Sequence, residues 1–332
     1  MSATVKKYLP LGPVLAAYLL LFLVGKTMEG KWQLIAMLAF YCAVGQAFNL
    51  FMGMTGYVDF GYVAFLGVGT YGMAIAISRW SDHGLGLGLL GIGLLMAIGM
   101  ATLLSLAVGA VALRLRGAYF AIATIGVNEG FRYLIEGARL WNGSEGIIFT
   151  AQLNTAFGRD FANVLSTYWA DVALFFIAPF AAFLTLCFLR SRIGYALTAI
   201  RTDEDAAKVM GINVTRYKII AFIVSASLAG MIGAVSWALK LTYVVPPDVF
   251  AISYTIEAII IVLLGGAGTL LGPIVGGLIY GLSKYYLAVI LPGFQLLIFA
   301  PIIIVIIVLF PEGTVGVLKK RVQGTAWEKI IV

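Results

Sequence analysis

The chain has 332 residues, of which 62% are hydrophobic and 11% charged, and its mean hydropathy is +1.02. This balance excludes a soluble globular domain. The formal charge of +7 is compatible with an anionic partner, but in a membrane chain the placement of the charges matters more than their sum. The cysteines Cys42 and Cys187 lie in apolar segments and imply no disulfide framework, and a single histidine, His83, argues against a histidine metal site.

Hydrophobic segments dominate the chain from end to end. Lys6 and Lys7 precede the first, residues 9–24, which no small-residue cleavage pattern follows, so an uncleaved span is expected. Later segments approach the roughly 20 residues needed to cross a bilayer. They cover residues 32–52, 58–78, 87–113, 118–135, 168–189, 219–239, 250–264, 273–290 and 294–310. The sequence therefore predicts an all-α polytopic membrane protein of about ten spanning or half-spanning helices, forming a single transmembrane domain over residues 1–332.

The basic residues are distributed unevenly between the two predicted sides. Alternation through ten spans places both termini on one side, which collects 14 of the 22 lysines and arginines, while the opposite loops hold six. Since lysine and arginine accumulate in cytoplasmic loops, both termini and the central loop, residues 190–218, are expected in the cytoplasm.

Two glycine-rich stretches interrupt the apolar pattern, one in each half of the chain. The first covers residues 53–71 and the second residues 265–277. Paired breaks at membrane depth point to a substrate path between two pseudo-related halves, although close helix packing through small residues is an alternative. The residues assigned to such a path are Asn49, Gly56, Asp59, Gly61, Glu129, Glu257, Gly265, Gly266, Gly268 and Pro273.

Charged residues within spans are energetically costly and often functional. Glu129 and Arg132 are three residues apart, and Arg132 and Glu136 are four apart, so a structural ion-pair ladder is expected on one helix face. Asp59 and Glu257 lie in or near the glycine breaks, which favours either pathway lining or pairing between the halves. The spacing does not decide which acid, if any, meets a substrate.

The central loop contains a short predicted helix, residues 203–210. Thr202 is expected as its N-cap, with Asp205 three residues on completing a capping box. Asp203, Glu204 and Asp205 occupy the first turn, where the helix dipole favours negative charge. Gly211 is expected to end the helix. The apolar side chains of Ala206, Val209 and Met210 share one face, and a helix this short needs a partner surface. A solvated connector between spans is the alternative.

The same residues resemble a known motif. Asp205-Ala206-Ala207 followed by Gly211 is similar to the E-A-A-x-x-x-G motif of ABC-importer permeases, with aspartate in place of glutamate. In that family the motif forms the coupling helix that contacts the ATP-binding subunit. The resemblance thus implies a coupling role for residues 202–211. Since Ala206 and Met210 frame the apolar face, Ala207 is expected to be buried in the same contact.

Other stretches resemble the LivM-type permeases of branched-chain amino acid importers. They are GYVDFGYVAFLGVGTYGMAI, LRLRGAYFAIATIGVNEGFRYL and SYTIEAIIIVLLGGAGTLLGPIVGGLIYG, and the likeness covers residues 49–313. It implies a non-catalytic permease of the bacterial inner membrane that carries branched-chain or other apolar amino acids. Its implied partners are a second, LivH-like permease, two ATP-binding subunits that hold ATP and magnesium, and an extracytoplasmic binding protein, with no nucleic acid and no cofactor of its own.

Three alternatives remain at this point. Permeases for urea or short amides share the same motifs, so the cargo is not fixed. A secondary transporter would also have paired broken helices, but it needs its own coupling-ion site. An integral membrane enzyme needs clustered reactive groups, and the sequence contains no G-x-S-x-G, C-x-x-C or H-E-x-x-H motif. Gly25-Lys26-Thr27 lacks the P-loop glycine, since position 20 is leucine, so this chain is not expected to hydrolyse ATP.

Overall fold

The fold is all-α, as the sequence predicts. The computed structural model describes residues 10–28, 30–137, 140–290, 301 and 313–316, and within them the only strands are two pairs of residues. Seven described helical stretches are long and apolar enough to cross a membrane. The expected span 294–310 lies almost wholly outside the described residues, so the predicted total of ten stays a prediction.

The chain forms two compact units, and both draw on the two halves of the sequence. Unit 1 comprises residues 1–56, 178–202 and 257–332, and unit 2 comprises residues 57–177 and 203–256. The boundary between residues 56 and 57 divides the first glycine-rich stretch between the two units, and the boundary between residues 202 and 203 divides the central loop. The expected pseudo-symmetry between the halves remains a prediction.

Unit 1 is built on the packing of two long helices. Its described elements are α2 (Leu11–Thr27), α3 (Trp32–Asn49), α4 (Met52–Thr55), the end of α10 (Ala170–Leu189), α11 (Arg192–Thr202), most of α15 (Ser253–Gly265) and α16 (Gly272–Ile290). Gly277 of α16 lies so near α3 that an added Cβ would be 2.8 Å from the Cys42 backbone nitrogen. Small residues therefore allow close contact between these helices, as is common in membranes.

Unit 2 surrounds a central helix, α5 (Val63–Trp80), which is buried from Val63 to Ile77. The other long helices are α6 (Gly88–Ala112), α7 (Ala118–Gly137) and α13 (Val214–Gly233), the last continuing into the π-helical η4 (Ala234–Leu239). Close contacts again involve glycines, because an added Cβ at Gly69 of α5 would lie 2.3 Å from Gly230 Cα of α13. The core of unit 2 thus depends on small side chains at helix contacts.

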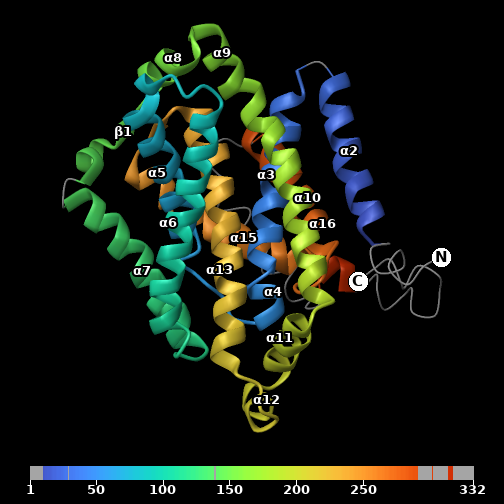
Figure 1. Cartoon of the computed structure of the whole chain (residues 1–332). Coiled ribbons are helices and arrows are strands. Elements are labelled where there is room, and N and C mark those ends of the chain that lie inside the picture. The colour runs from blue at the N-terminus through green and yellow to red at the C-terminus, as the bar shows by residue number, and fades with distance from the viewer. Residues whose placement is uncertain (1–9, 29, 138–139, 291–300, 302–312, 317–332) are drawn as a thin grey trace. The chain divides into compact units, whose positions relative to one another are not determined.

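Short elements occupy both ends of unit 2 (Figure 1). At one end lie η1 (Ser81–His83), η2 (Leu140–Glu145), α8 (Thr150–Phe157), α9 (Arg159–Val164), the π-helical η3 (Leu165–Trp169), α14 (Pro246–Val249) and the antiparallel strands β1 (Ile147–Ile148) and β2 (Tyr243–Val244). At the opposite end lies α12 (Glu204–Val209). The short helix that the sequence predicts within the central loop is therefore present, and it projects from one end of its unit.

Candidate functional site

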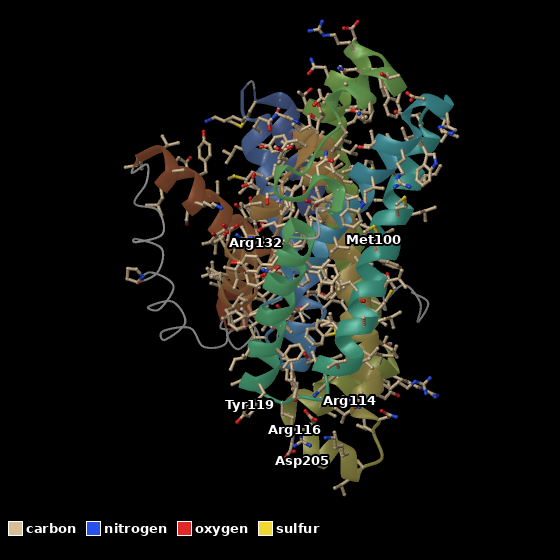
Figure 2. The ribbon with its side chains drawn as sticks, turned by 90° about the vertical axis from the view of Figure 1, so that its left-hand side faces the viewer. Met100, Arg114, Arg116, Tyr119, Arg132 and Asp205 are labelled. Carbon is tan, nitrogen blue, oxygen red and sulfur yellow. The ribbon has the colours of Figure 1, made fainter. Side chains whose placement is uncertain are left out.

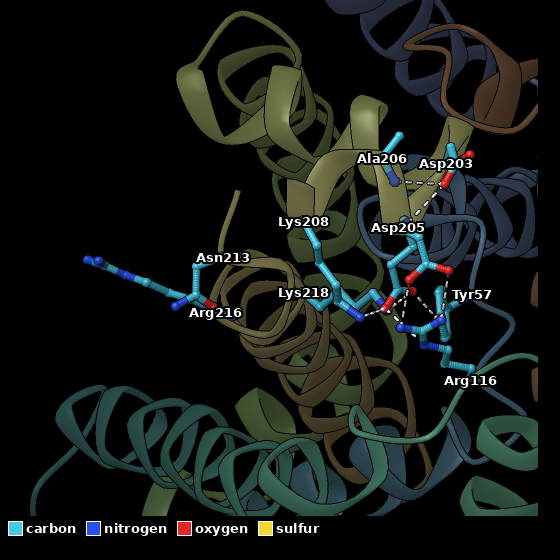
Figure 3. Close-up of polar contacts among 10 residues, drawn as sticks. Tyr57, Arg116, Asp203, Asp205, Ala206, Lys208, Asn213, Arg216 and Lys218 are labelled. Carbon is cyan, nitrogen blue, oxygen red and sulfur yellow. Dashed lines mark hydrogen bonds and ion pairs between the residues drawn. The ribbon is translucent and has the colours of Figure 1, made fainter. Parts of the chain in front are cut away.

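The N-terminus of α12 is capped by Asp203 (Figure 3). Its Oδ1 accepts hydrogen bonds from the backbone N–H groups of Asp205, at 2.9 Å, and Ala206, at 3.0 Å. The prediction that Thr202 is the N-cap is wrong, because α11 continues through Thr202, whose hydroxyl donates to the Thr198 carbonyl at 3.0 Å. Asp203 is the first residue with an extended backbone, at φ −156° and ψ 112°, as an N-cap requires.

Gly211 terminates α12, as predicted: the helix runs to Val209, Met210 is its C-cap, and Gly211 follows in the left-handed conformation. Gly211 has φ +84°, its N–H donates to the Lys208 carbonyl at 3.0 Å, and the Ile212 N–H donates to the Ala207 carbonyl at 3.0 Å. This pair of bonds is a Schellman motif, which needs a left-handed residue at the position that Gly211 occupies. Both ends of this short helix are thus fixed by local hydrogen bonds.

The side chain of Glu204 ties α12 to the rest of unit 2. Its Oε2 accepts hydrogen bonds from Lys218 Nζ at 2.6 Å and from the Tyr57 hydroxyl at 2.5 Å, while Lys208 Nζ binds Oε1 at 3.0 Å. Arg116 approaches Oε1 to 3.5 Å and contacts Asp205 at 2.9 Å. We call Tyr57, Arg116, Glu204, Lys208 and Lys218 the anchor cluster. It joins α12 to α13, to the segment before α5 and to the α6–α7 connection.

The carboxyl group of Glu204 is ionised at neutral pH, and its partners in the anchor cluster are the cause. Burial alone would raise the pKa of Glu204, but hydrogen bonds from Lys218, Tyr57 and Lys208 outweigh it and lower that pKa to about 2. Burial, followed by the hydrogen bond to Glu204, raises the pKa of Tyr57 well above its ordinary value, so the phenol acts as a neutral donor. The Lys218 ammonium also lies 3.6 Å from the centroid of the Tyr57 ring, a favourable cation–π position.

The two faces of α12 differ sharply in exposure. Ala207 is 4% exposed, whereas Val209 is 87% and Met210 82% exposed. The expectation that Ala207 is buried in a contact with a partner is wrong, because its side chain is already buried within the chain. Ala206 is exposed. The large apolar side chains exposed at the end of α12 are therefore Val209 and Met210.

The beginning of the first glycine stretch and the second stretch meet inside unit 1. Asn49 joins them, since its amide donates to the Thr269 carbonyl at 3.0 Å and accepts from the Gly268 N–H at 2.8 Å. An added Cβ at Gly53 would lie 2.5 Å from the Gly268 nitrogen. Close packing therefore accounts for these glycines, and a role for them in a substrate path remains a prediction.

Arg201, at the end of α11, fastens the same region of unit 1. Its guanidinium donates to the Gly53 carbonyl at 2.5 Å and to the Ala267 carbonyl at 3.2 Å. Gly56 and Gly268 have positive φ values of 75° and 77°, and an added Cβ at Gly268 would lie 2.5 Å from the Arg201 guanidinium. Glycine at position 268 thus leaves room for the arginine.

The remaining predicted pathway residues of the second stretch form a tight turn. An added Cβ at Gly265 would fall within 3 Å of the Gly272 backbone, and Gly266 has φ 122°. Pro273 is the second residue of α16, a position where proline is tolerated because no intrahelical donor is lost. These residues terminate α15 and start α16.

Asp59 and Gly61 form a local turn in unit 2. Asp59 is 1% exposed, and its Oδ1 accepts from the Gly61 N–H at 2.9 Å. An added Cβ at Gly61 would lie 2.2 Å from the Thr124 carbonyl oxygen of α7. The pair therefore positions the start of α5 closely against α7, and the assignment of Asp59 to a substrate path stays a prediction.

The other acids within spans are paired. Arg132 binds Glu136 at 3.0 Å and Glu129 at 3.4 Å, which confirms the expected ladder on α7. Glu257 binds Lys284 at 2.5 Å within unit 1. Sequence reasoning missed the pair of Asp171 with Lys240, at 2.6 Å, because the partners are 69 residues apart. Among the described residues, no three His, Cys, Asp or Glu side chains are arranged to hold a metal ion.

A polar pocket of about 490 Å³ lies at the end of unit 2 opposite α12. Thr150, Asn154, Arg159, Asp160 and Thr242 contribute to its lining. Sequence reasoning did not identify it, because Thr242 lies 92 residues from Thr150, whose hydroxyl it contacts at 2.8 Å.

Comparison with known proteins matches most of the chain. The family described as "Branched-chain amino acid transport system / permease component" matches residues 32–307. The chain is 27% identical to the high-affinity branched-chain amino acid transport system permease protein LivM of Salmonella typhimurium and 28% identical to LivM of Escherichia coli, in each case over 77% of this chain and 63% of the relative. It is 26% identical to LivH of Escherichia coli, over 83% of this chain and 91% of the relative.

The chain thus aligns with less than two thirds of the length of the LivM relatives. No solved structure matches it.

Proposed function

The chain belongs to the family of branched-chain amino acid transport system permease components, and on that premise we propose that it is the membrane-spanning permease subunit of an ATP-driven importer. Its proposed cargo is a branched-chain amino acid, the cargo in the names of its LivM and LivH relatives, or another apolar amino acid. The proposed partners are a second permease, two ATP-binding subunits and an extracytoplasmic binding protein. The protein would reside in the bacterial inner membrane with both termini in the cytoplasm, and it would leave ATP hydrolysis to its partners.

The observation that carries this proposal beyond family membership is the construction of α12. Val209 and Met210 are exposed on a helix whose opposite side is fastened by Glu204. An exposed apolar edge on a short helix suits a groove in another protein. The anchor cluster would make α12 move as one body with α13, so that closure of the ATP-binding subunits displaces membrane helices of unit 2 and changes access to the substrate.

Transport assays with the complete system test the cargo. We expect uptake of labelled leucine by membranes that contain this chain and its partners, and competition by unlabelled isoleucine or valine. Membranes that take up labelled urea or a labelled short amide, and whose uptake excess leucine leaves unchanged, would exclude the amino acid assignment. Uptake that persists without ATP-binding subunits would instead favour a secondary transporter.

The coupling role is tested at Val209. Val209→Asp places a charge on the exposed edge of α12 without disturbing a buried contact in this chain, and Val209→Ile is the matched apolar control. We expect Val209→Asp to lower both recovery of the ATP-binding subunits and leucine uptake, with Val209→Ile close to wild type. Normal assembly and uptake in Val209→Asp would mean that α12 is a solvated connector.

A further inference from the structure

Helices α6 and α7 both present large exposed side chains, and Figure 2 labels Met100 on α6 and Tyr119 on α7. On α6, Leu95, Leu103 and Val111 are 70%, 67% and 71% exposed, and all three are aliphatic. On α7, Tyr119, Ile122 and Tyr133 are 74%, 66% and 61% exposed. Both helices also expose small residues, among them Gly91 and Ala107 of α6. The large exposed side chains are thus aliphatic on α6, whereas those on α7 include two tyrosines.

Two glycines lie in the middle of the outward side of α7. Gly126 and Gly130 are exposed, and an added Cβ at either would meet no heavy atom within 4 Å. Their four-residue spacing gives the G-x-x-x-G pattern, which lets a second membrane helix approach closely. At helical periodicity they lie on the same side as Ile122 and Tyr133. We call Tyr119, Ile122, Gly126, Gly130 and Tyr133 the α7 face.

An ion triad borders the α7 face. The side chains of Glu129, Arg132 and Glu136 are 34%, 29% and 17% exposed. In Figure 2, α7 faces the viewer and carries the label of Arg132. At 1.5 Å per residue, Glu129 lies about 12 Å inside the C-terminal end of α7. A carboxylate that is one third exposed at that depth is costly against lipid and normally faces protein or a wet cavity. Accordingly, α7 is not among the seven stretches apolar enough to span by composition.

From these observations we propose that the α7 face packs against a membrane helix of a second permease subunit, a different chain of the same family, which shelters the Glu129–Arg132–Glu136 triad. This inference rests on the proposed function. The triad carries two carboxylates and one guanidinium, for a formal charge of −1. A second copy of this chain would bring two such charges together, so the partner helix presents hydrogen-bond donors or a basic side chain at this depth.

Matched glycine substitutions test the interface in the complete transporter. Gly99 of α6 also meets nothing within 4 Å of an added Cβ, and it lies one turn from both Leu95 and Leu103. Both positions therefore have room for a side chain in the isolated chain, and Gly99→Leu is the matched control for Gly126→Leu. We expect Gly126→Leu to reduce recovery of the second permease by about tenfold or more because a leucine blocks close helix approach, while Gly99→Leu leaves it unchanged.

Photo-crosslinking identifies the partner directly. A p-benzoylphenylalanine at Ile122 or Tyr133 should form an adduct with a membrane chain that mass spectrometry identifies as another permease of this family, whereas the same probe at Leu103 should form none. Lipid adducts alone, adducts with a second copy of this chain, or equal behaviour of the two glycine variants would overturn the proposal. Leucine uptake by the unsubstituted system is measured in parallel. Its absence would refute the proposed function, whereas normal uptake with equal glycine variants would refute the interface alone.

Discussion

Arg201 and Glu204 are three residues apart in sequence, but they fasten the central segment in two different ways. Arg201 ends α11 and donates to the carbonyls of Gly53 and Ala267 in unit 1. Glu204 begins α12 and accepts from side chains of unit 2, among them Lys218. The guanidinium of Arg201 is exposed and binds neutral backbone carbonyls. The carboxylate of Glu204, by contrast, pairs with the buried ammonium of Lys218. The two anchors should therefore differ in what their loss costs.

The largest effect is expected from Glu204→Ala. Lys218 is 1% exposed, and removing the partner of a buried charge typically costs about 3–5 kcal/mol. We expect faster thermal inactivation of the purified complex and loss of uptake. Asp205→Ala is the control, because Asp205 pairs with the same Arg116 but its side chain is 72% exposed, and an exposed pair contributes about 1 kcal/mol or less.

A double variant separates charge from packing at the same anchor. Glu204→Gln combined with Lys218→Met removes both charges, and such replacements are often close to neutral. We expect it to recover much of the stability that Glu204→Ala loses. A double variant as unstable as Glu204→Ala would show that the shape of the anchor cluster matters more than its charges.

A smaller loss is expected from Arg201→Met. A hydrogen bond to a charged group contributes about 1.5–3 kcal/mol, and Arg201 is exposed, which places its contribution at the lower end of that range. The expected result is a modest fall in thermal stability, with α12 still protected from proteolysis. Arg216→Met, at an exposed site on α13, is the control. An effect of Arg201→Met as large as that of Glu204→Ala would remove the distinction between the anchors.

Local signals in the sequence predict local structure well in this chain. The i,i+3 and i,i+4 spacing around Arg132 predicted the ion ladder on α7, and the glycine at position 211 predicted the end of α12. Both depend on contacts within about one helical turn. The apolar segment lengths likewise predicted the all-α membrane fold, because each span needs its own run of hydrophobic residues.

Contacts between distant segments could not be predicted in the same way. Tyr57 reaches Glu204 from 147 residues away, and no periodicity connects the two. The sequence therefore does not reveal that Glu204 binds side chains of its own unit, nor that Ala207 is buried within the chain. The N-cap was missed because Thr202 and Asp203 are adjacent and both favour caps, and only the length of α11 decides between them.

The corrected N-cap gives a further, smaller prediction. Asp203→Ala removes two hydrogen bonds at the start of α12, and loss of a cap typically costs about 1 kcal/mol. Thr202→Ala removes only a bond to the Thr198 carbonyl within α11. We therefore expect faster hydrogen exchange in α12 for Asp203→Ala than for Thr202→Ala. The reverse order would restore Thr202 as the cap.

The smallest effect is expected from mild acid. The pKa of Glu204 in the folded chain is about 2, below the ordinary glutamate value of 4.5. A carboxyl group with a lowered pKa stabilises the folded state above its unfolded pKa, and this contribution is lost as the pH falls through the folded value. Protection factors for the α12 amides, corrected for intrinsic exchange rates, should thus be equal at pH 7 and pH 5.5 and fall only between about pH 4.5 and pH 2. A loss of protection already at pH 5.5, in the wild type but not in the Glu204→Gln, Lys218→Met double variant, would show that Glu204 takes up its proton far more easily than its contacts with Lys218 and Tyr57 imply. The pH dependence therefore tests the anchor cluster in the unsubstituted chain.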